Sequence, residues 1–132
     1  MILVDGNGTP IGIDIASASE AEVNLIEKLI DNRVCDEAPE RLLYDKAADS
    51  DPLRQRLAAQ QIDLICPHRK NRKRKPLQDR RKLRRFKRRY KVERTISWLG
   101  NYRRLLVRHE YWNHIFAGFA QLACLFTILK RF

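Results

Sequence analysis

Cysteine is scarce in this sequence of 132 residues, and its three cysteines, Cys35, Cys66 and Cys124, lie far apart. No two of them have the close spacing that is typical of paired zinc ligands. An odd, scattered set in a small chain argues against a disulfide scaffold and against a structural zinc site. His109 and His114 do not change this, because their spacing does not place both on one helical face. We therefore expect idle thiols in a reducing, cytoplasmic environment.

The sequence also lacks an apolar run that is long enough to cross a membrane comfortably. The best candidate, residues 115–129, is shorter than the ~20 residues that a spanning helix needs, and it contains Gly118 and Gln121. The first four residues are apolar, but Asp5 and Gly6 follow at once, which is not the pattern of a secretory signal peptide. The run therefore predicts a buried C-terminal helix and no membrane partner. A helix that lies on a membrane surface is the weaker alternative.

Acidic residues are nearly missing from the second half of the chain. Residues 67–132 hold 3 Asp or Glu against 21 Lys or Arg, whereas residues 1–66 hold 13 against 6. The halves thus carry +18 and −7, which together make the formal +11 of the whole chain. This asymmetry indicates a polyanionic partner for the second half, with nucleic acid ahead of a membrane surface. Like charges repel one another and Pro76 interrupts a regular helix, so residues 69–77 are expected to form a basic loop.

The remaining patterns predict one mixed α/β domain over residues 1–132. Two short apolar runs flank the turn at residues 5–8, which is a hairpin signal because Asn and Gly tolerate positive φ. Apolar runs predict further strands at residues 41–45 and 62–66. Helical spacing predicts helices at residues 17–32, from residue 51, from residue 78 to about 106, and near the C-terminus. This order predicts a mixed sheet with flanking helices, a long basic helix among them.

Two carboxylates are candidates for chemistry. Asp45 ends a predicted strand, where open α/β sheets place ligands and catalytic groups. Glu93 is the only acid between Asp79 and Glu110, and Arg89 lies on the same helical face four residues earlier. Two carboxylates beside a basic surface suit Mg²⁺ or Mn²⁺ ions that act on phosphodiesters. Taken alone, the composition favours a simpler interpretation, in which Asp45 caps a turn and Glu93 pairs with Arg89.

Several segments resemble the DDE transposases of insertion sequences, in the same order along the chain. Residues 44–51 read YDKAADSD, similar to the ADKGYDSD segment that carries the second catalytic Asp of that family. Residues 89–99 read RYKVERTISWL, similar to the RWVVERTFSWL segment that carries the catalytic Glu. Residues 101–110 continue like the RFRRLRVRYE that follows it, and residues 5–12 match a hairpin typical of the group.

The resemblance implies an RNase H-like fold, of which this chain is the C-terminal part. It also implies DNA transposition, the cutting and joining of the double-stranded ends of a transposable element, with Mg²⁺ or Mn²⁺ at a two-metal site. Asp45 and Glu93 carry over as the second and third catalytic, metal-binding acids. The first acid belongs to a strand before the hairpin, and neither Asp5 nor Asp14 matches its motif. We therefore expect an incomplete site, an inactive isolated chain, and the upstream segment or a full-length transposase as a partner.

The departures from the family pattern affect the DNA contacts as well. Ala47-Ala48 replaces the family's Gly-Tyr, and Gly100 replaces the basic residue often found seven positions after the Glu. The expected DNA-binding residues are Arg84, Arg85, Arg88, Arg89, Lys91, Arg103 and Arg104. Two alternatives stay open. In the first, the chain is a non-catalytic basic DNA-binding protein, such as a regulator that competes with a transposase for the ends of the element. In the second, it is a basic protein of the membrane surface.

Overall fold

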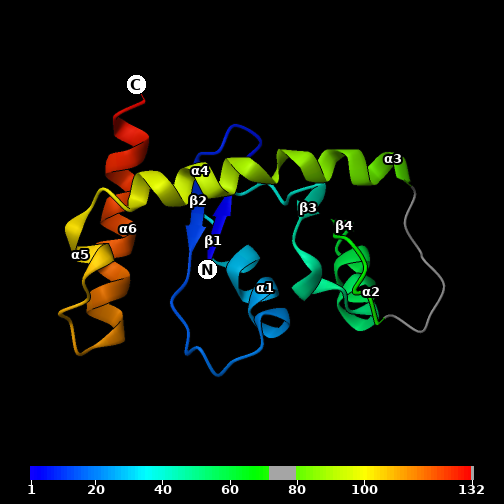
Figure 1. The fold of residues 1–132 in the computed structure, drawn as a ribbon, viewed down its shortest axis with the longest axis horizontal. Helices are drawn as coiled ribbons and strands as arrows, with labels where there is room; N and C mark the ends of the chain where they lie inside the picture. The colour runs from blue at the N-terminus through cyan, green and yellow to red at the C-terminus, as the bar shows by residue number, and fades with distance from the viewer. Residues whose placement is uncertain (72–79, 132) are drawn as a thin grey trace.

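In the part of the chain that the structure describes, four short strands form two separate sheets instead of the one mixed sheet that the sequence predicts. The computed structural model describes residues 1–71 and 80–131, so most of the expected basic loop at residues 69–77 lies outside the described residues. The strands are β1 (Ile2–Val4), β2 (Pro10–Ile13), β3 (Arg41–Leu43) and β4 (Asp63–Ile65). β1 and β2 pair antiparallel as a hairpin, and β3 and β4 pair parallel. The architecture is a mixed α/β arrangement around these two small sheets (Figure 1).

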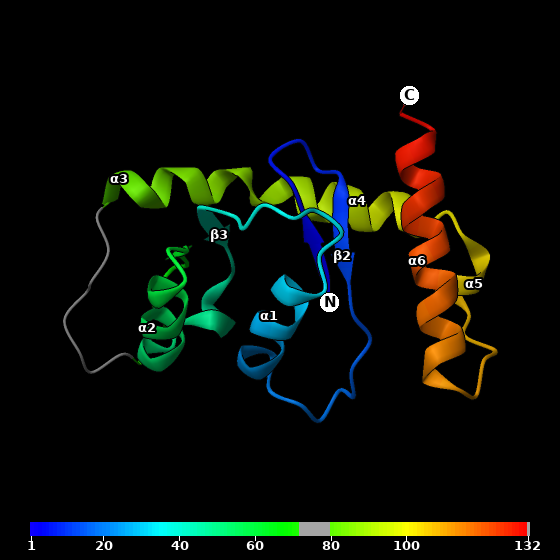
Figure 2. The ribbon, with the colours of Figure 1, turned by 180° about the vertical axis from the view of Figure 1, so that it is seen from behind.

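Helices connect and cover the strands. They are α1 (Glu22–Asp31), η1 (Lys46–Ala48), α2 (Asp51–Ala59), α3 (Arg80–Leu83), η2 (Arg84–Arg89), α4 (Tyr90–Leu99), α5 (Arg103–Leu106) and α6 (Asn113–Leu129), of which η1 and η2 are 3₁₀ helices. α3, η2 and α4 follow one another as a single rod that runs over both sheets, and α6 crosses the rod near its end (Figures 1 and 2). None of the described helices is long and apolar enough to cross a membrane.

The predicted hairpin is confirmed, and its turn is held by one carboxylate. Asp5 Oδ1 accepts hydrogen bonds from the main-chain N–H of Asn7 at 2.8 Å and of Thr9 at 2.7 Å. Gly8 takes a φ of +84°, which costs a residue without a Cβ little. The turn is also attached to α4, because Thr95 Oγ1 donates to Gly8 O at 2.6 Å. This bond joins residues that are far apart in the chain and fixes α4 over the hairpin.

Alternation along the hairpin sends apolar side chains to both of its faces. Leu3 is buried in the larger core cluster, together with residues of α1, α2 and the β3–β4 sheet. Ile2 and Ile13 point the other way and pack against Leu99 of α4 and Ala123 of α6. The hairpin therefore lies between α1 on one side and the C-terminal helices on the other.

The parallel pair forms the second part of the core. Leu42 pairs with Leu64 across the ladder, and both are buried. α2 covers them with Leu53 and Leu57, which are fully buried at the spacing that the sequence predicts. Pro52 stands in the first turn of α2, where its missing N–H removes no helical hydrogen bond. These elements place the end of β3, and with it Asp45, at the edge of a well-packed core.

Two predictions about helix boundaries are wrong. α1 begins at Glu22 after an Ala21 cap, and no side-chain capping bond from Ser17 or Ser19 is present. The long basic helix ends at Leu99, and Leu106 lies on the separate α5, 69% exposed. The rod also contains six residues of 3₁₀ helix at η2.

The expectation of a buried C-terminal helix is only half right. Ala120, Ala123, Cys124 and Thr127 of α6 are buried against the hairpin, α4 and α5. On the opposite face the larger side chains are exposed, and they are Ile115, Leu122, Leu125, Phe126 and Leu129. Small residues thus face the core and large ones face outward. The apolar composition of the segment does not indicate this division.

Candidate functional site

Asp45 lies two residues after the end of β3, at the carboxyl end of a strand, as the sequence predicts. Its Oδ1 accepts a 2.7 Å hydrogen bond from Ala47 N–H and so caps the short helix η1. Ala48 in that helix is fully buried in the core. The cap and the buried alanine together fix the backbone that carries the carboxylate. This contact also agrees with the simpler interpretation of Asp45 as a capping residue.

Tyr44 ties the strand end to the start of α1. Its phenol donates a 2.9 Å hydrogen bond to Glu22 Oε2. Burial raises the pKa of Tyr44 above its ordinary value, and the hydrogen bond and the negative charge of Glu22 raise it further. The charge of Asp45 acts in the same direction and that of Arg89 in the opposite one. The Tyr44 phenol therefore remains protonated, within reach of both the Asp45 and the Arg89 charges.

Glu93 stands in the first turn of α4 with its side chain 63% exposed. Arg89 Nη1 lies 3.7 Å from Glu93 Oε1, four residues earlier on the same helix. Arg89 also lies over the ring of Phe86, 6.0 Å from its centre. An exposed pair at this distance contributes little to stability, so the Glu93 carboxylate is available for other partners. The same contact agrees with the simpler interpretation of an ion pair on a helix surface.

Arg89 interacts with Glu93 and with the neighbour of Asp45. It pairs with Glu93 directly, and its charge reaches the phenol of Tyr44, the neighbour of Asp45. Among the described residues no hydrogen bond or ion pair joins Asp45 to Glu93, and no group of three or more His, Cys, Asp or Glu could hold a metal ion. Carboxylate oxygens are the ligands that Mg²⁺ and Mn²⁺ prefer, so the donor chemistry fits such ions. The number of donors does not, because two acids fall short of a complete site.

A buried carboxylate that the sequence reasoning did not single out organises the loop around Asp45. The side chain of Asp49 is 1% exposed, and its Oδ1 lies 3.2 Å from Arg54 Nη2 and 3.0 Å from His68 Nδ1. Its Oδ2 accepts a 2.9 Å bond from the main-chain N–H of Arg69. The Arg69 guanidinium in turn donates to Lys46 O at 3.0 Å and to the carbonyl oxygen of Ala47 at 2.7 Å. The beginning of the basic segment is thus bound to the turn that Asp45 caps.

We expect replacement of Asp49 by Ala to lower the free energy of unfolding by about 3 kcal/mol, because it leaves the Arg54 cation buried without its carboxylate. Urea unfolding followed by circular dichroism measures the change. Glu40→Ala is the matched control, since the Glu40 side chain is 82% exposed beside Arg41. It should change stability by less than about 0.5 kcal/mol. Equal effects of the two substitutions would contradict the assigned role of Asp49.

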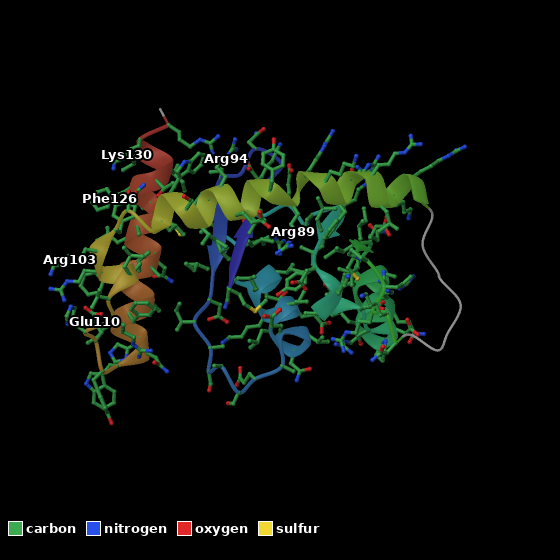
Figure 3. All side chains as sticks on the ribbon, in the orientation of Figure 1. Arg89, Arg94, Arg103, Glu110, Phe126 and Lys130 are labelled. Atoms are coloured by element: carbon green, nitrogen blue, oxygen red, sulfur yellow. The ribbon has the colours of Figure 1, made fainter. Side chains whose placement is uncertain are left out.

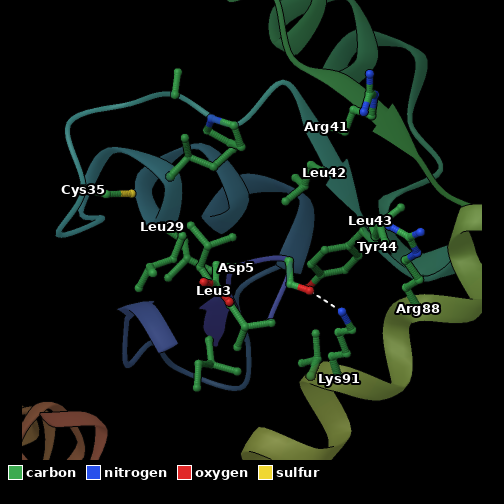
Figure 4. Close-up of a pocket in the computed structure, with 18 of the residues that line it drawn as sticks. Leu3, Asp5, Leu29, Cys35, Arg41, Leu42, Leu43, Tyr44, Arg88 and Lys91 are labelled. Carbon is green, nitrogen blue, oxygen red and sulfur yellow. Dashed lines mark hydrogen bonds between the residues drawn. The ribbon is translucent and has the colours of Figure 1, made fainter. Parts of the chain in front are cut away.

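The candidate DNA contacts fall into two separate groups. Arg84, Arg85 and Arg88 are exposed on η2, and Arg89 and Lys91 follow them half-buried. The Lys91 ammonium donates to Gly6 O in the hairpin turn, so part of its capacity is already used (Figure 4). Arg103 lies on α5, past the far end of α4 and well away from Arg89 (Figure 3).

Arg104 is the most constrained of the candidate DNA contacts. Its Nη1 donates to Glu110 Oε1 at 3.0 Å, and its guanidinium lies over Phe119, 5.5 Å from the ring centre. Glu110 is a half-buried acid of the region resembling the family's RFRRLRVRYE segment. To bind DNA, the Arg104 guanidinium would first have to break its contacts with Glu110 and Phe119.

Comparison with known proteins agrees with the resemblance to DDE transposases over nearly the whole chain. Residues 1–128 match the family described as "Transposase DDE domain". No curated protein and no solved structure matches the chain.

Proposed function

Because the chain belongs to the transposase DDE-domain family, we propose that it contributes two of three metal-binding acids to a DNA-cleaving site and holds DNA with a basic helix. The family connects the chain with DNA transposition and with divalent metals, and a partial RNase H-like fold is compatible with the two small sheets. In this proposal Asp45 and Glu93 are the acids. η2 and the start of α4 bind the phosphates of an element end.

One observation supports the proposal: Arg89 on the exposed basic rod interacts both with Glu93 and with Tyr44, the neighbour of Asp45. Glu93 forms an ion pair with Arg89, and Tyr44, the neighbour of Asp45, lies within the influence of the same cation. A phosphate bound by Arg89 would lie beside the Glu93 carboxylate and on the side of the strand end that carries Asp45. Asp45 and Glu93, together with an acid from another polypeptide segment, would hold Mg²⁺ or Mn²⁺, which stabilises the charge that develops during phosphodiester cleavage.

A second candidate function is a DNA-binding regulator that does no chemistry. It is favoured by the two carboxylate contacts that need no metal, the Asp45 cap and the Arg89–Glu93 pair. Such a protein would compete with a full transposase for element ends through the same basic residues. It differs from the first candidate in that neither Asp45 nor Glu93 would matter to it.

Nicking by a fusion protein tests the proposal. The first-acid segment of a full-length family member is joined ahead of residue 1, and the fusion is incubated with Mg²⁺ or Mn²⁺ and a duplex carrying that member's element ends. We expect Asp45→Asn to lower the nicking rate by more than about 100-fold, which is the upper range for loss of a residue that only supports a metal ligand. The new amide oxygen can still accept the bond from Ala47 N–H, so the turn is preserved. A fusion that nicks equally well with Asp45→Asn would favour the regulator.

A further inference from the structure

The exposed face of α6 carries a regular apolar pattern that begins two residues ahead of the helix. Exposed residues recur there at alternating steps of four and three residues. The positions, called the α6 seam below, are Tyr111, Ile115, Gly118, Leu122, Leu125 and Leu129. Steps that average 3.5 residues keep a stripe on one side of a helix, and two helices pack along one another on stripes of this kind.

The α6 seam lies on the opposite side of the helix from the core. Ala120, Ala123, Cys124 and Thr127 are buried against the hairpin, α4 and α5, and they alternate along the helix with the seam positions. A Cβ atom on Gly118 would meet no atom outside its own stretch of helix within 4 Å, so the middle of the seam is open. α6 stands at one end of the molecule, across the end of the rod (Figures 1 and 2). The described part of the chain therefore leaves the seam uncovered.

The chemistry of the seam indicates what covers it. α6 contains no Asp, Glu, Lys or Arg. DNA phosphates bind to cations, so the seam is not a DNA contact. A helix that lies on an anionic lipid surface has a polar face rich in Lys and Arg, whereas the other face of α6 is part of the core. An uncharged apolar stripe complements another one, and a second copy of the chain presents the same stripe.

We propose that two copies of the chain pair through their α6 seams, with the two helices antiparallel. Charge decides the direction, because Lys130 and Arg131 directly follow the uncharged helix. In a parallel pair these cations would lie beside the same cations of the second copy, and like charges repel. Antiparallel pairing sends them to opposite ends. It also places the positive N-terminus of each helix beside the negative C-terminus of the other.

The spacing of the seam also sets the register of the pair. The two-fold axis passes at the height of Ala120, so Leu122 of one copy meets Gly118 of the other. By the same symmetry Leu125 meets Ile115, and Leu129 meets Tyr111. The open space at Gly118 thus receives a leucine side chain, and every seam position has one partner. The inference goes beyond the proposed function and does not rest on it, because the seam contains none of the proposed acids or DNA contacts.

Sedimentation equilibrium of the full chain, without DNA or metal, tests the pairing. We expect a monomer–dimer equilibrium with a dissociation constant of roughly 1–100 µM, because six positions from each copy make a small interface. Leu122→Glu should raise this constant at least about 30-fold, since it removes a central apolar contact and places two like carboxylates near the axis. Leu122 is 44% exposed, so the variant should keep the thermal melt of the unaltered chain.

Val34→Glu is the matched control for the Leu122 substitution. It puts the same charge in place of an apolar side chain that is 80% exposed and lies outside α6. The dissociation constant of the dimer should not change in this variant. A dimer that weakens equally with both substitutions would show that added negative charge, and not the seam, controls association.

The distance between two spin labels tests the direction of the helices. Lys130→Cys is made together with Cys35→Ser, because Cys35 is exposed whereas Cys66 and Cys124 are buried. Residue 130 lies ten positions from the axis at Ala120, so antiparallel pairing places the two labelled residues roughly 30 Å apart along the pair. Parallel pairing would place them about 10 Å apart, at the distance between packed helices.

Four results would overturn the inference. They are a chain that is still monomeric at about 500 µM, a dimer that Leu122→Glu leaves unchanged, a label distance near 10 Å, and flotation with phosphatidylserine vesicles that Leu122→Glu abolishes. The last result would assign the seam to a lipid surface instead. None of these measurements involves cleavage, so the proposed acids Asp45 and Glu93 are judged by nicking alone.

Discussion

Replacement of Glu93 by Gln should abolish DNA nicking by the fusion protein, with a loss of more than about 100-fold, and leave DNA binding intact. The change keeps the size of the side chain and removes its charge, so a metal-binding role is lost while the surface is preserved. Stability should hardly change, because the Glu93 side chain is 63% exposed and its ion pair with Arg89, at 3.7 Å, lies on the surface. Nicking is measured on duplex element ends, and binding by mobility shift without metal.

Two acids of this chain serve as controls for the Glu93 result. Glu40→Gln removes a carboxylate that pairs with Arg41 at the surface, and Asp14→Asn removes one that lies 3.0 Å from Lys28 Nζ. Neither should change nicking in the fusion. The chain without the added segment should not nick DNA at any metal concentration, since two acids do not complete the site. Glu93-dependent cleavage by the unfused chain would show that the set of acids has been assigned wrongly.

DNA affinity should fall by about a thousandfold between 50 and 200 mM salt and depend little on the DNA sequence. Basic side chains release condensed counterions from the phosphates that they neutralise. With about six phosphates neutralised, log K against log[salt] should slope near −5. Arg84, Arg85 and Arg88 are exposed on η2, and Arg89 is half-buried beside them. Replacing these four by Ala should flatten the slope by roughly three to four units.

The Arg103→Ala, Arg104→Ala double variant separates the two basic groups. Arg104 is bound to Glu110 and lies over Phe119, so we expect this variant to flatten the slope by only about one unit, contributed by Arg103. Salt titrations of a duplex without element ends measure both sets of variants. A slope near zero for the unaltered chain would remove DNA binding from the proposal. A larger effect of the double variant than of the η2 set would move the DNA path to α5.

Local patterns in the sequence were sufficient to predict the elements that depend on residues close together in the chain. The apolar runs around residues 42 and 64 predict strands that form, and Pro52 marks the start of α2. The Asp45 and Glu93 motifs could be found because the resemblance rests on contiguous residues. The placement of Asp45 after β3 agrees with it, while the roles of both acids stay predictions.

Contacts between distant residues decided the rest, because periodicity contains no information about them. Asp49 becomes the centre of a buried network only when His68 and Arg69 fold back on it. The two sheets stay separate because no described strand pairs with the facing edges of β1 and β3, and a count of strands does not reveal which edges meet. The same holds for α6: its composition made it apolar, and packing against the hairpin selected the small side chains of Ala120 and Ala123 for the buried face. Local sequence thus determined the charge, the element types and the family, and tertiary packing decided which polar groups are satisfied and which edges stay open.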